Sequence, residues 1–541
     1  MFLDLKLSGG LVVDGSGNPW FRRDVGIKGD RIVAIGDLRS APAHREVKAE
    51  GLVVCPGFID MHSHSDVMLL AEPEAKPKVW QGVTTEVLGQ DGLGVAPSAP
   101  EYPEDWAQYR QYLVGLLGAP SVDYDWNSFA DYLTRLEQAR PSDNVAVLLS
   151  YGALRVAAMG LASREPTPRD MRQMKAIIDE AMVQGAIGLS LGMPYEPCVY
   201  ATDPELTELY RVVAQRGGFM VIHLWNESDM LEKSLRRAAQ VCLDSGAPLH
   251  ISHLKCAGKA NWGRSGAVLE LLESFRRSGL EVTFDQYPYV AGSTLLSYIL
   301  PPWATKGGLS ETLARLRLSE ERARIKHDIA EGTTEWDMSW DNDAKLAGWD
   351  GLVIASVRSE RNKPLEGKTL EELGRMRGVD PADAAMDLLL EEEGAVTMVE
   401  FLACEEDLKE FMRSDFHTAG TDGIYGGKPH PRLYGSFPRI LARYVREEQN
   451  FSLAQAIRHM TWMPAQRLGL RDRGLIAENM AADIVVFDPA AIEDKASYSA
   501  PIQPPVGVRW VIVNGQVVIE GGEHTGARPG RVLRRHVAPG R

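Results

Sequence analysis

Two histidines that stand two positions apart, His62 and His64, give the first sign of chemistry in the sequence. They follow an apolar run in CPGFIDMHSHSD. Along a strand, side chains two residues apart point to the same face, so both imidazoles can reach one metal ion. A His-x-His pair alone is weak evidence, because paired histidines also occur on protein surfaces. The apolar run that ends in this pair makes a metal site the stronger interpretation.

Three further polar residues end apolar runs in the same way. They are His223 in FMVIHLWNES, His253 in PLHISHLK and Asp422 in AGTDG. Taken one at a time, a buried histidine with satisfied hydrogen bonds or a helix-capping aspartate is the better explanation. Parallel strands of a barrel end at one rim, so the histidines and the aspartate together predict a shared metal centre.

The elements that must position these residues are apolar, strand-like runs, each followed by a helix-like segment. Eight such runs are GFIDMHSH, TTEVLGQ, VAVLLSYG, AIGLSLG, FMVIHLW, PLHISHLK, VTFDQYPY and HTAGTDG. They are apolar on both faces, which is typical of parallel strands covered by helices, and ELTELYRVVAQR has the spacing of a covering helix. The sequence therefore predicts the α/β class, with a (β/α)8 barrel whose polar residues lie at the carboxyl ends of the strands.

The two ends of the chain carry β-prone runs separated by turn signals. These are KLSGGLVVDGSGNP and DVGIKGDRIVAIGD near the start, and ADIVVFDP and VRWVIVNGQVVIEGG near the end. We predict a small β-sandwich built from residues 1–57 and 471–541, with the metal-dependent barrel over 58–470. A break at about 290–419 is too long for an ordinary connection and is predicted to be a lid or pocket wall. Its second half reads equally well as a structural insertion away from the site.

Composition excludes several classes of partner. The formal charge of −15 disfavours binding to nucleic acid, which needs clustered lysine and arginine. No window approaches the roughly 18 apolar residues of a membrane span. No signal peptide is visible, so we expect a cytoplasmic protein. The 5 cysteines are scattered over 541 residues, which argues against a disulfide framework.

The chain resembles the D-aminoacylase, or N-acyl-D-amino-acid deacylase, branch of the amidohydrolase superfamily nearly from end to end. The segments that carry the resemblance are ISHLKCAGKANWG, DQYPYVAGST, HPRLYGSFPR and TGARPGR. It implies that His62, His64, His223 and His253 bind zinc, as one or two ions, and that Asp422 is catalytic.

The chain departs from the family pattern at two positions. The family's second-strand motif reads GNCG, with the cysteine on zinc, whereas this chain has Gly-Gln-Asp-Gly with Asp91 in the cysteine's place. A carboxylate also binds zinc and bridges two ions, but as a harder ligand it shifts preference toward manganese, cobalt or iron. The alternative is that Asp91 only caps a turn. Trp225 stands where the family has an arginine, and we expect it to form a pocket wall or to pack.

The resemblance also implies how the substrate is held and cut. Lys255, Tyr287 and Arg432 match the residues that hold the substrate's α-carboxylate, with Ser293 as a further polar contact. The arginine fork, the mobile lysine charge and the tyrosine hydroxyl can together orient one carboxylate. For Tyr287, packing beside a proline is the alternative. Asp422 is expected to take a proton from a metal-bound water and return it to the leaving amine.

The expected substrate is a small N-acyl-D-amino acid, or a short peptide that ends in a D-residue. The stretch STLLSYILPPWATK has no arginine and is rich in apolar residues, which predicts an apolar or neutral D-side chain. A cyclic-amide hydrolase of the dihydroorotase or hydantoinase kind is an alternative, but the fourth strand offers no lysine for carboxylation. A catalytically silent barrel that serves as a binding protein is disfavoured by the intact set of candidate ligands.

Overall fold

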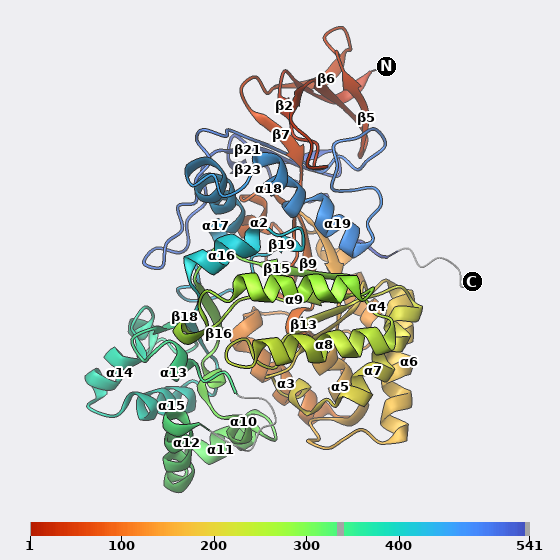
Figure 1. Ribbon diagram of the computed structural model, residues 1–541. Coiled ribbons are helices and arrows are strands. Elements are labelled where there is room, and N and C mark those ends of the chain that lie inside the picture. The colour runs from red at the N-terminus through yellow and green to blue at the C-terminus, as the bar shows by residue number, and fades with distance from the viewer. Residues whose placement is uncertain (1, 119, 333–339, 536–541) are drawn as a thin grey trace.

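The computed structural model describes residues 2–118, 120–332 and 340–535, and parallel strands surrounded by helices form its centre (Figure 1). The strands are β8 (Phe58–Asp60), β9 (Val83–Leu88), β10 (Asn144–Val147), β11 (Leu149–Ser150), β12 (Leu189–Gly192), β13 (Met220–His223), β14 (Leu249–Ile251), β15 (Val282–Gln286) and β19 (His417–Ala419). They pair in the order β8, β9, β10 in one sheet and β11, β12, β13, β14, β15, β19 in another. Each predicted run forms a strand or, in the third run, the two short strands β10 and β11.

Backbone hydrogen bonds join the last of these strands to the first. Met61 N donates to Ala419 O at 3.1 Å, and Asp422 N donates to His62 O at 2.8 Å. The carboxyl ends of β8 and β19 therefore lie side by side. As a result, His62 and Asp422 are neighbours although 359 residues of chain lie between them.

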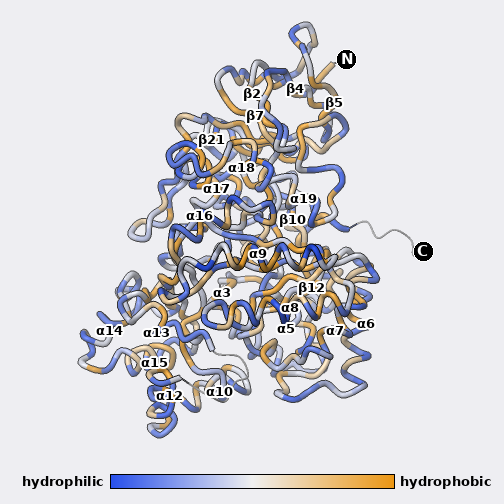
Figure 2. Tube along the Cα trace, in the orientation of Figure 1, coloured by the Kyte–Doolittle hydropathy of each residue, from blue (hydrophilic) through white to orange (hydrophobic). Residues whose placement is uncertain are grey.

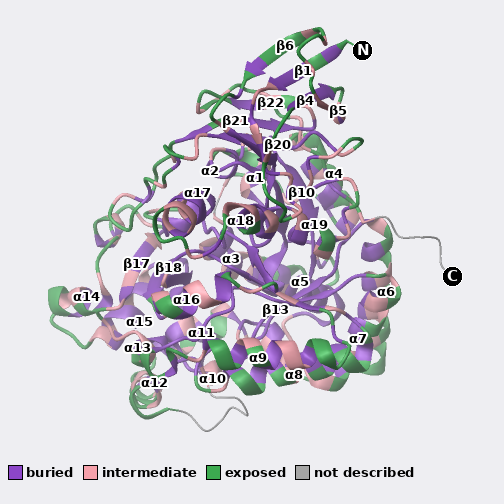
Figure 3. Cartoon of the chain, turned by 45° about the horizontal axis from the view of Figure 1, so that its top comes forward, coloured by how far each residue is buried: buried purple, intermediate pink, exposed green. Residues whose placement is uncertain are grey.

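Helices cover the outside of the parallel strands. They include α3 (Pro103–Leu117), α4 (Phe129–Ala139), α5 (Tyr151–Met159), α6 (Pro168–Gln184), α7 (Asp203–Gln215), α8 (Leu231–Ser245), α9 (Ser265–Arg277), α16 (Glu405–Met412), α18 (Leu453–Met460) and α19 (Trp462–Leu468). In α7, Leu206, Leu209 and Val213 are buried at helical spacing, and each buried leucine contributes about 1.5–3 kcal/mol. Figures 2 and 3 show the buried, apolar strands inside, with exposed faces on α6, α7, α8 and α9.

Shorter elements complete this region. They are α1 (Met68–Ala71), α2 (Lys76–Val79) and α17 (Arg432–Arg439), which continues into a π-helix over Ile440–Glu447. Among the described residues, no helix combines the length and the apolar character needed to cross a bilayer.

Both ends of the chain build one β-region, at the top of Figure 1. One sheet has the order β5 (Arg31–Gly36), β4 (Asp24–Lys28), β1 (Leu3–Ser8), β6 (Ala43–Lys48). The other has the order β23 (Glu523–His524), β22 (Gln516–Glu520), β21 (Val508–Val513), β20 (Ile484–Phe487), β7 (Val53–Pro56), β2 (Leu11–Val12), β3 (Phe21–Arg22). Side chains of both sheets, among them Val25 and Ile512, form one apolar cluster, so the two sheets pack together.

The break between β15 and β19 forms a separate unit at the lower left of Figure 1. It contains an antiparallel sheet of β16 (Ala291–Leu295), β18 (Val396–Phe401) and β17 (Leu352–Val357). Its helices are α10 (Pro302–Thr305), α11 (Leu309–Leu316), α12 (Ser319–Glu331), α13 (Asp343–Leu346), α14 (Leu370–Arg377) and α15 (Pro381–Glu391).

This insertion has its own hydrophobic core, which contains Leu296, Ile299 and Leu300. These three residues belong to the stretch STLLSYILPPWATK, on which the predicted apolar substrate pocket rested, so part of that stretch is packed inside the insertion. Helix α16 falls within the range predicted for the break, but it packs on α9, where Asp407 accepts a hydrogen bond from Ser265 Oγ at 2.6 Å.

A buried polar network ties the terminal β-region to the parallel strands. Arg473 pairs with Asp483, which also accepts from Asn514 N at 2.7 Å and from Asn144 Nδ2 at 3.1 Å. Asn514 Nδ2 in turn donates to Asn144 Oδ1 at 2.7 Å. Since Asn144 begins β10, this network links the C-terminal part of the β-region to the parallel strands.

We expect Arg473→Met to destabilise the protein, because it leaves the Asp483 carboxylate buried without its cation. The loss should be about 3–5 kcal/mol, the range for breaking a buried ion pair. Urea-induced unfolding, followed by circular dichroism, measures it. Arg471→Met is the control, since Arg471 is exposed and the change there should stay within about 0.5 kcal/mol. Equal unfolding midpoints for the two variants would contradict a stabilising role of the network.

Candidate metal centre

The candidate ligands converge at the carboxyl ends of the strands. Two groups of side chains have ligand atoms within 4.8 Å of one another, and they share Asp91. The groups are His62, His64, Asp91 and Asp422, and Asp91, His223 and His253. His62 and His64 lie just beyond the end of β8 rather than within it, and His223 is the last residue of β13. All members of both groups are buried.

Asp91 stands between the two groups. Its Oδ2 atom lies 3.2 Å from His62 Nε2, 3.6 Å from His64 Nε2 and 3.6 Å from His253 Nε2. His223 Nδ1 lies 2.9 Å from His253 Nε2. Two ligands bonded at about 2.1 Å to one tetrahedral ion are separated by about 3.4 Å. The separations therefore suit a divalent ion in each group, with the Asp91 carboxylate between them.

Asp91 fits a ligand better than a turn cap. It adopts a left-handed conformation, with φ of 53°, in the short turn after β9. Its Oδ2 atom faces imidazoles, and its buried Oδ1 atom has no hydrogen-bond partner among the described residues. An unsatisfied buried acceptor costs about 1–3 kcal/mol, which a metal bond would remove. Imidazoles and a carboxylate form a donor set that suits zinc, and equally manganese, cobalt or iron.

Two carboxylates outside the predicted set orient the imidazoles. Asp285 Oδ1 accepts from His253 N at 2.9 Å, and its other oxygen lies 3.4 Å from His62 Nδ1. Glu227 Oε1 lies 3.1 Å from His253 Nδ1, and Glu227 Oε2 accepts from Lys255 Nζ at 2.6 Å. Carboxylates that hold the second nitrogen of a ligand imidazole fix its tautomer and direction. The sequence signal for both was an acidic residue in or directly after an apolar strand, DQ in VTFDQ and NE in HLWNE.

The electrostatics of the site favour a bound cation. Burial lowers the pKa of His62, but the carboxylates of Asp91, Asp285 and Asp422 outweigh this effect and raise that pKa well above its usual value. Burial and Lys255 lower the pKa of His253, whereas the neighbouring carboxylates bring it to about 9. The carboxylates thus attract positive charge, and a metal ion would displace the protons that the imidazoles otherwise hold.

Asp422 lies at the meeting point of the ligands and the predicted carboxylate-binding residues. Its Oδ1 atom is 3.1 Å from His64 Nε2, and its Oδ2 atom is 2.9 Å from Arg432 Nη1. Burial raises the pKa of Asp422, but the positive charges of Arg432 and His62 lower it by more. The side chain is therefore ionised. Its φ of 48° is unusual for an aspartate and costs on the order of 1–3 kcal/mol. The hydrogen bond from Asp422 N to His62 O holds this conformation.

Of the predicted substrate-binding residues, Arg432 contacts Asp422, and Tyr287 and Ser293 lie against Arg432. The Arg432 guanidinium lies 4.4 Å from the centre of the Tyr287 ring, and its Nη2 atom donates to Ser293 O at 2.9 Å. The Ser293 hydroxyl itself donates to Met398 O at 2.7 Å, so Ser293 holds Arg432 through its main chain.

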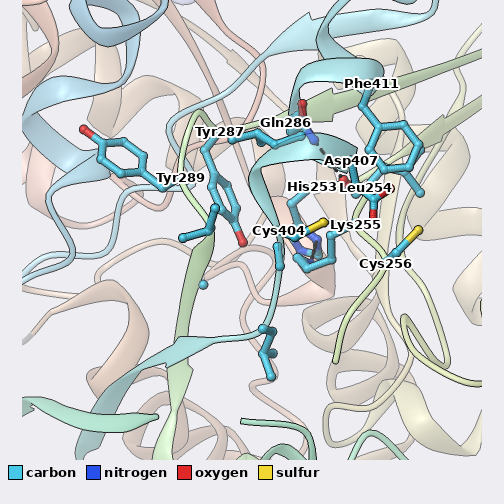
Figure 4. Close-up of a pocket in the computed structure, with 15 residues that line it drawn as sticks. His253, Leu254, Lys255, Cys256, Gln286, Tyr287, Tyr289, Cys404, Asp407 and Phe411 are labelled. Carbon is cyan, nitrogen blue, oxygen red and sulfur yellow. Dashed lines mark hydrogen bonds between the residues drawn. The ribbon is translucent and has the colours of Figure 1, made fainter. Parts of the chain in front are cut away.

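Figure 4 shows Lys255 and Tyr287 lining one pocket together with His253 and Gln286. Lys255 Nζ lies 3.0 Å from His253 Nδ1 in addition to its contact with Glu227. Burial raises the pKa of Tyr287 to about 12, so its hydroxyl stays protonated and able to donate. Tyr287 therefore borders the site and is not only a packing residue.

Trp225 packs rather than lines the site. It is 4% exposed and belongs to the main hydrophobic cluster. The Arg237 guanidinium, on α8, lies 4.2 Å from the centre of its ring. Of the two interpretations of this departure, the structure supports packing.

Comparisons with known proteins agree with this geometry. The model of a family described as the amidohydrolase family matches residues 45–519. An N-acyl-D-glutamate deacylase from Alcaligenes xylosoxydans xylosoxydans is 36% identical over 534 residues, which cover 98% of this chain and 97% of that protein. A D-aminoacylase from the same organism is 34% identical over 539 residues, covering 99% and 98%.

A solved structure is similar to this chain in both sequence and fold. The N-acyl-D-glutamate deacylase from Bordetella bronchiseptica, complexed with zinc and a phosphonate inhibitor that mimics the tetrahedral intermediate, superposes with a TM-score of 0.84. The match has 32% sequence identity and covers 99% of this chain and 100% of that one. The fold is thus the barrel fold of these deacylases, in agreement with the predicted (β/α)8 arrangement.

We expect Asp91→Ala to lose bound metal, because Asp91 is the residue that both ligand groups share. Metal retained after dialysis against a mild chelator, measured by plasma mass spectrometry, should fall at least tenfold. Asp407→Asn is the control, since it changes a buried aspartate at the α9–α16 contact. Wild-type metal content in Asp91→Ala would show that Asp91 is only a turn residue.

Proposed function

The chain belongs to the amidohydrolase family, and from that membership we propose that it hydrolyses the amide bond of N-acyl-D-amino acids. The products are a carboxylic acid and a D-amino acid. The observation that carries the proposal is the position of Asp422, in contact with His64 on one side and with Arg432 on the other. With the roles proposed here, this arrangement would bring a proton-transfer group, a metal centre and a carboxylate-binding arginine to one point.

The metal would be held by the ligands at the rim of the barrel, which we propose to be His62, His64, Asp91, His223 and His253. A divalent metal such as zinc lowers the pKa of bound water to about 7 and polarises a carbonyl oxygen. The protein's own part is to fix the imidazoles through Asp285 and Glu227, and to keep the carboxylates ionised.

Asp422 is proposed as the group that moves the proton. In its ionised form it accepts a proton from the attacking water, and it then donates that proton to the leaving nitrogen. A positioned acid–base group of this kind contributes about 100- to 10,000-fold in rate. The pKa of Asp422 is lowered by Arg432, so a substrate carboxylate that draws Arg432 away would make Asp422 a stronger base.

Lys255, Tyr287 and Arg432 are proposed to bind the substrate's α-carboxylate. Lys255 follows β14, Tyr287 follows β15 and Arg432 begins α17, so the three side chains come from separate elements. Arg432 is buried and tied to Ser293 O, which sets the direction of its guanidinium. Ser293 therefore acts as a positioning residue for Arg432.

We propose that the insertion forms one wall of the substrate pocket. Its strands β16 and β18 carry Ser293 and Glu400. Glu400 and Tyr287 both lie against Gly292: a Cβ atom placed on Gly292 would be 2.7 Å from Glu400 Oε1 and 3.2 Å from the Tyr287 hydroxyl. A buried carboxylate beside Tyr287 repels an acidic substrate side chain. We therefore propose a neutral or apolar D-side chain rather than D-glutamate or D-aspartate. A dipeptide that ends in such a residue fits the same description.

We expect Asp422→Asn to keep its metal but to lower kcat on N-acetyl-D-leucine by about 100- to 10,000-fold. The amide keeps the shape of the side chain but cannot accept the proton. Steady-state assay of D-leucine release, with metal content measured on the same sample, checks this. Loss of metal together with activity would point to a ligand role instead, and a kcat near that of the wild type would rule out proton transfer by Asp422.

The substrate preference predicts an order of activity among related amides. N-acetyl-D-leucine should be cut with a kcat/KM at least tenfold above that for N-acetyl-D-glutamate, and N-acetyl-L-leucine should not be cut. Glu400→Gln removes the carboxylate beside Tyr287. It should therefore reduce the ratio of the kcat/KM for N-acetyl-D-leucine to the kcat/KM for N-acetyl-D-glutamate. Faster cleavage of the glutamate compound by the wild type would contradict the proposed pocket.

A further inference from the structure

A second cavity lies at the opposite end of the parallel strands from the metal centre. Its volume is about 330 Å³. It is lined where four strands begin: Phe219 precedes β13, Pro248 precedes β14, Glu281 precedes β15 and Phe416 precedes β19. The active-site chemistry proposed above uses none of these residues.

Arginines from four separate positions line this cavity. They are Arg276 at the end of α9, Arg458 on α18, Arg467 on α19 and Arg535 near the C-terminus. In Figure 1 the ends of α9 and α19 lie on the side where the C-terminal segment leaves the fold. The elements thus bring positive charge to one hollow from parts of the chain far apart in sequence.

The acidic residues of the same cavity do not neutralise its interior. The side chains of Glu281 and Asp415 are 80% and 74% exposed, whereas the side chain of Arg467 is 7% exposed. The Glu281 carboxylate stays 3.9 Å from Arg467 Nη1. The Arg467 cation therefore lies inside the cavity, whereas the two carboxylates lie at its rim, in solvent that screens them.

Arg467 lacks the close counter-ion that a buried charge requires. Burial lowers the pKa of Arg467 to about 10, and Arg535 adds to this effect. Arg535 Nη1 is buried and has no hydrogen-bond partner among the described residues. A buried cation and an unsatisfied guanidinium donor facing one cavity are stabilised by an anion that enters it.

We propose that this cavity binds phosphate, either as the free ion or as the phosphate monoester of a small molecule. Guanidinium groups bind phosphate through paired, charge-assisted hydrogen bonds, and several arginines can share its oxygens. The volume exceeds that of one phosphate ion, which leaves room for a small organic group beside Phe219 and Phe416.

A chain of hydrogen bonds connects this site to the metal ligands. Arg467 Nε donates to Thr283 Oγ1 at 2.8 Å, and Thr283 Oγ1 lies 2.7 Å from His250 Nδ1. His250 Nε2 lies 3.0 Å from Asp285 Oδ2, and Asp285 holds the backbone of His253. An anion that repositions Arg467 acts on this chain, so its binding should change how firmly the metal is held.

Calorimetric titration of the metal-loaded protein with inorganic phosphate and with glycerol 3-phosphate tests the site, at constant ionic strength set with chloride. Arg276→Gln and Arg458→Gln should each weaken binding at least tenfold, since both side chains are partly exposed and their loss should leave the fold intact. Arg471→Gln, outside the cavity, should bind as the wild type does. Unchanged binding in both cavity variants would place the phosphate elsewhere, for example at the metal centre, and would overturn the proposal. Absence of phosphate binding to the wild type would overturn it as well.

The two ligands distinguish the source of the phosphate. Tighter binding of glycerol 3-phosphate supports a phosphorylated small molecule, and equal or weaker binding supports the free ion. Thr283→Val then tests the connection, because it removes the hydroxyl that links Arg467 to His250. In the wild type, the bound ligand should change the rate of zinc loss to a chelator at least twofold, and in Thr283→Val the ligand should bind without that change. An equal change in both proteins, or none in the wild type, would refute the connection.

Discussion

The concentration of buried carboxylates at one rim of the barrel is the constraint on which the rest of the site depends. Asp91, Asp285 and Asp422 lie within hydrogen-bond or ion-pair distance of His62. Negative charge in so small and dry a space is stable only with positive charge among it, from imidazolium, guanidinium or a metal ion. The same concentration of negative charge would hold a divalent cation tightly, whereas Arg432 and His62 are the groups that keep Asp422 ionised.

The fold holds this charge in place through a second buried network below the rim. Asp60 Oδ1 accepts from His62 N at 3.2 Å and from Thr421 N at 2.7 Å. Lys78, fully buried, donates to Asp60 Oδ2 at 2.7 Å and so neutralises it. The first and last strands are thereby fixed relative to each other, and His62 and Asp422 keep the separation that the chemistry needs. Such preorganisation reduces the cost of arranging charges during reaction.

Much of this arrangement could be predicted from the sequence, because each strand is a short apolar run that ends in a polar residue. That local pattern predicted the strands. Because parallel strands end at one rim, it also predicted that His62, His223, His253 and Asp422 lie close together. Glu227 and Asp285 were missed although each lies in or directly after an apolar strand, because that position alone does not show which imidazole the carboxylate contacts. The positions of Leu296 and Ile299 could not be predicted from local sequence either. An apolar residue in an insertion can line a pocket or pack in the insertion's own core, and only the packing of the folded chain decides between them.

The pairing of Arg432 with Asp422 has a consequence for selectivity. If Arg432 binds the substrate carboxylate as proposed, an amide without a neighbouring carboxylate would have nothing with which to compete for the guanidinium, and the basicity of Asp422 would stay suppressed. Such a compound would enter the pocket and leave it uncut. Discrimination of this kind operates on turnover rather than on affinity, and it would let an enzyme with a reactive metal centre work among the many side-chain and peptide amides of a cell without attacking them.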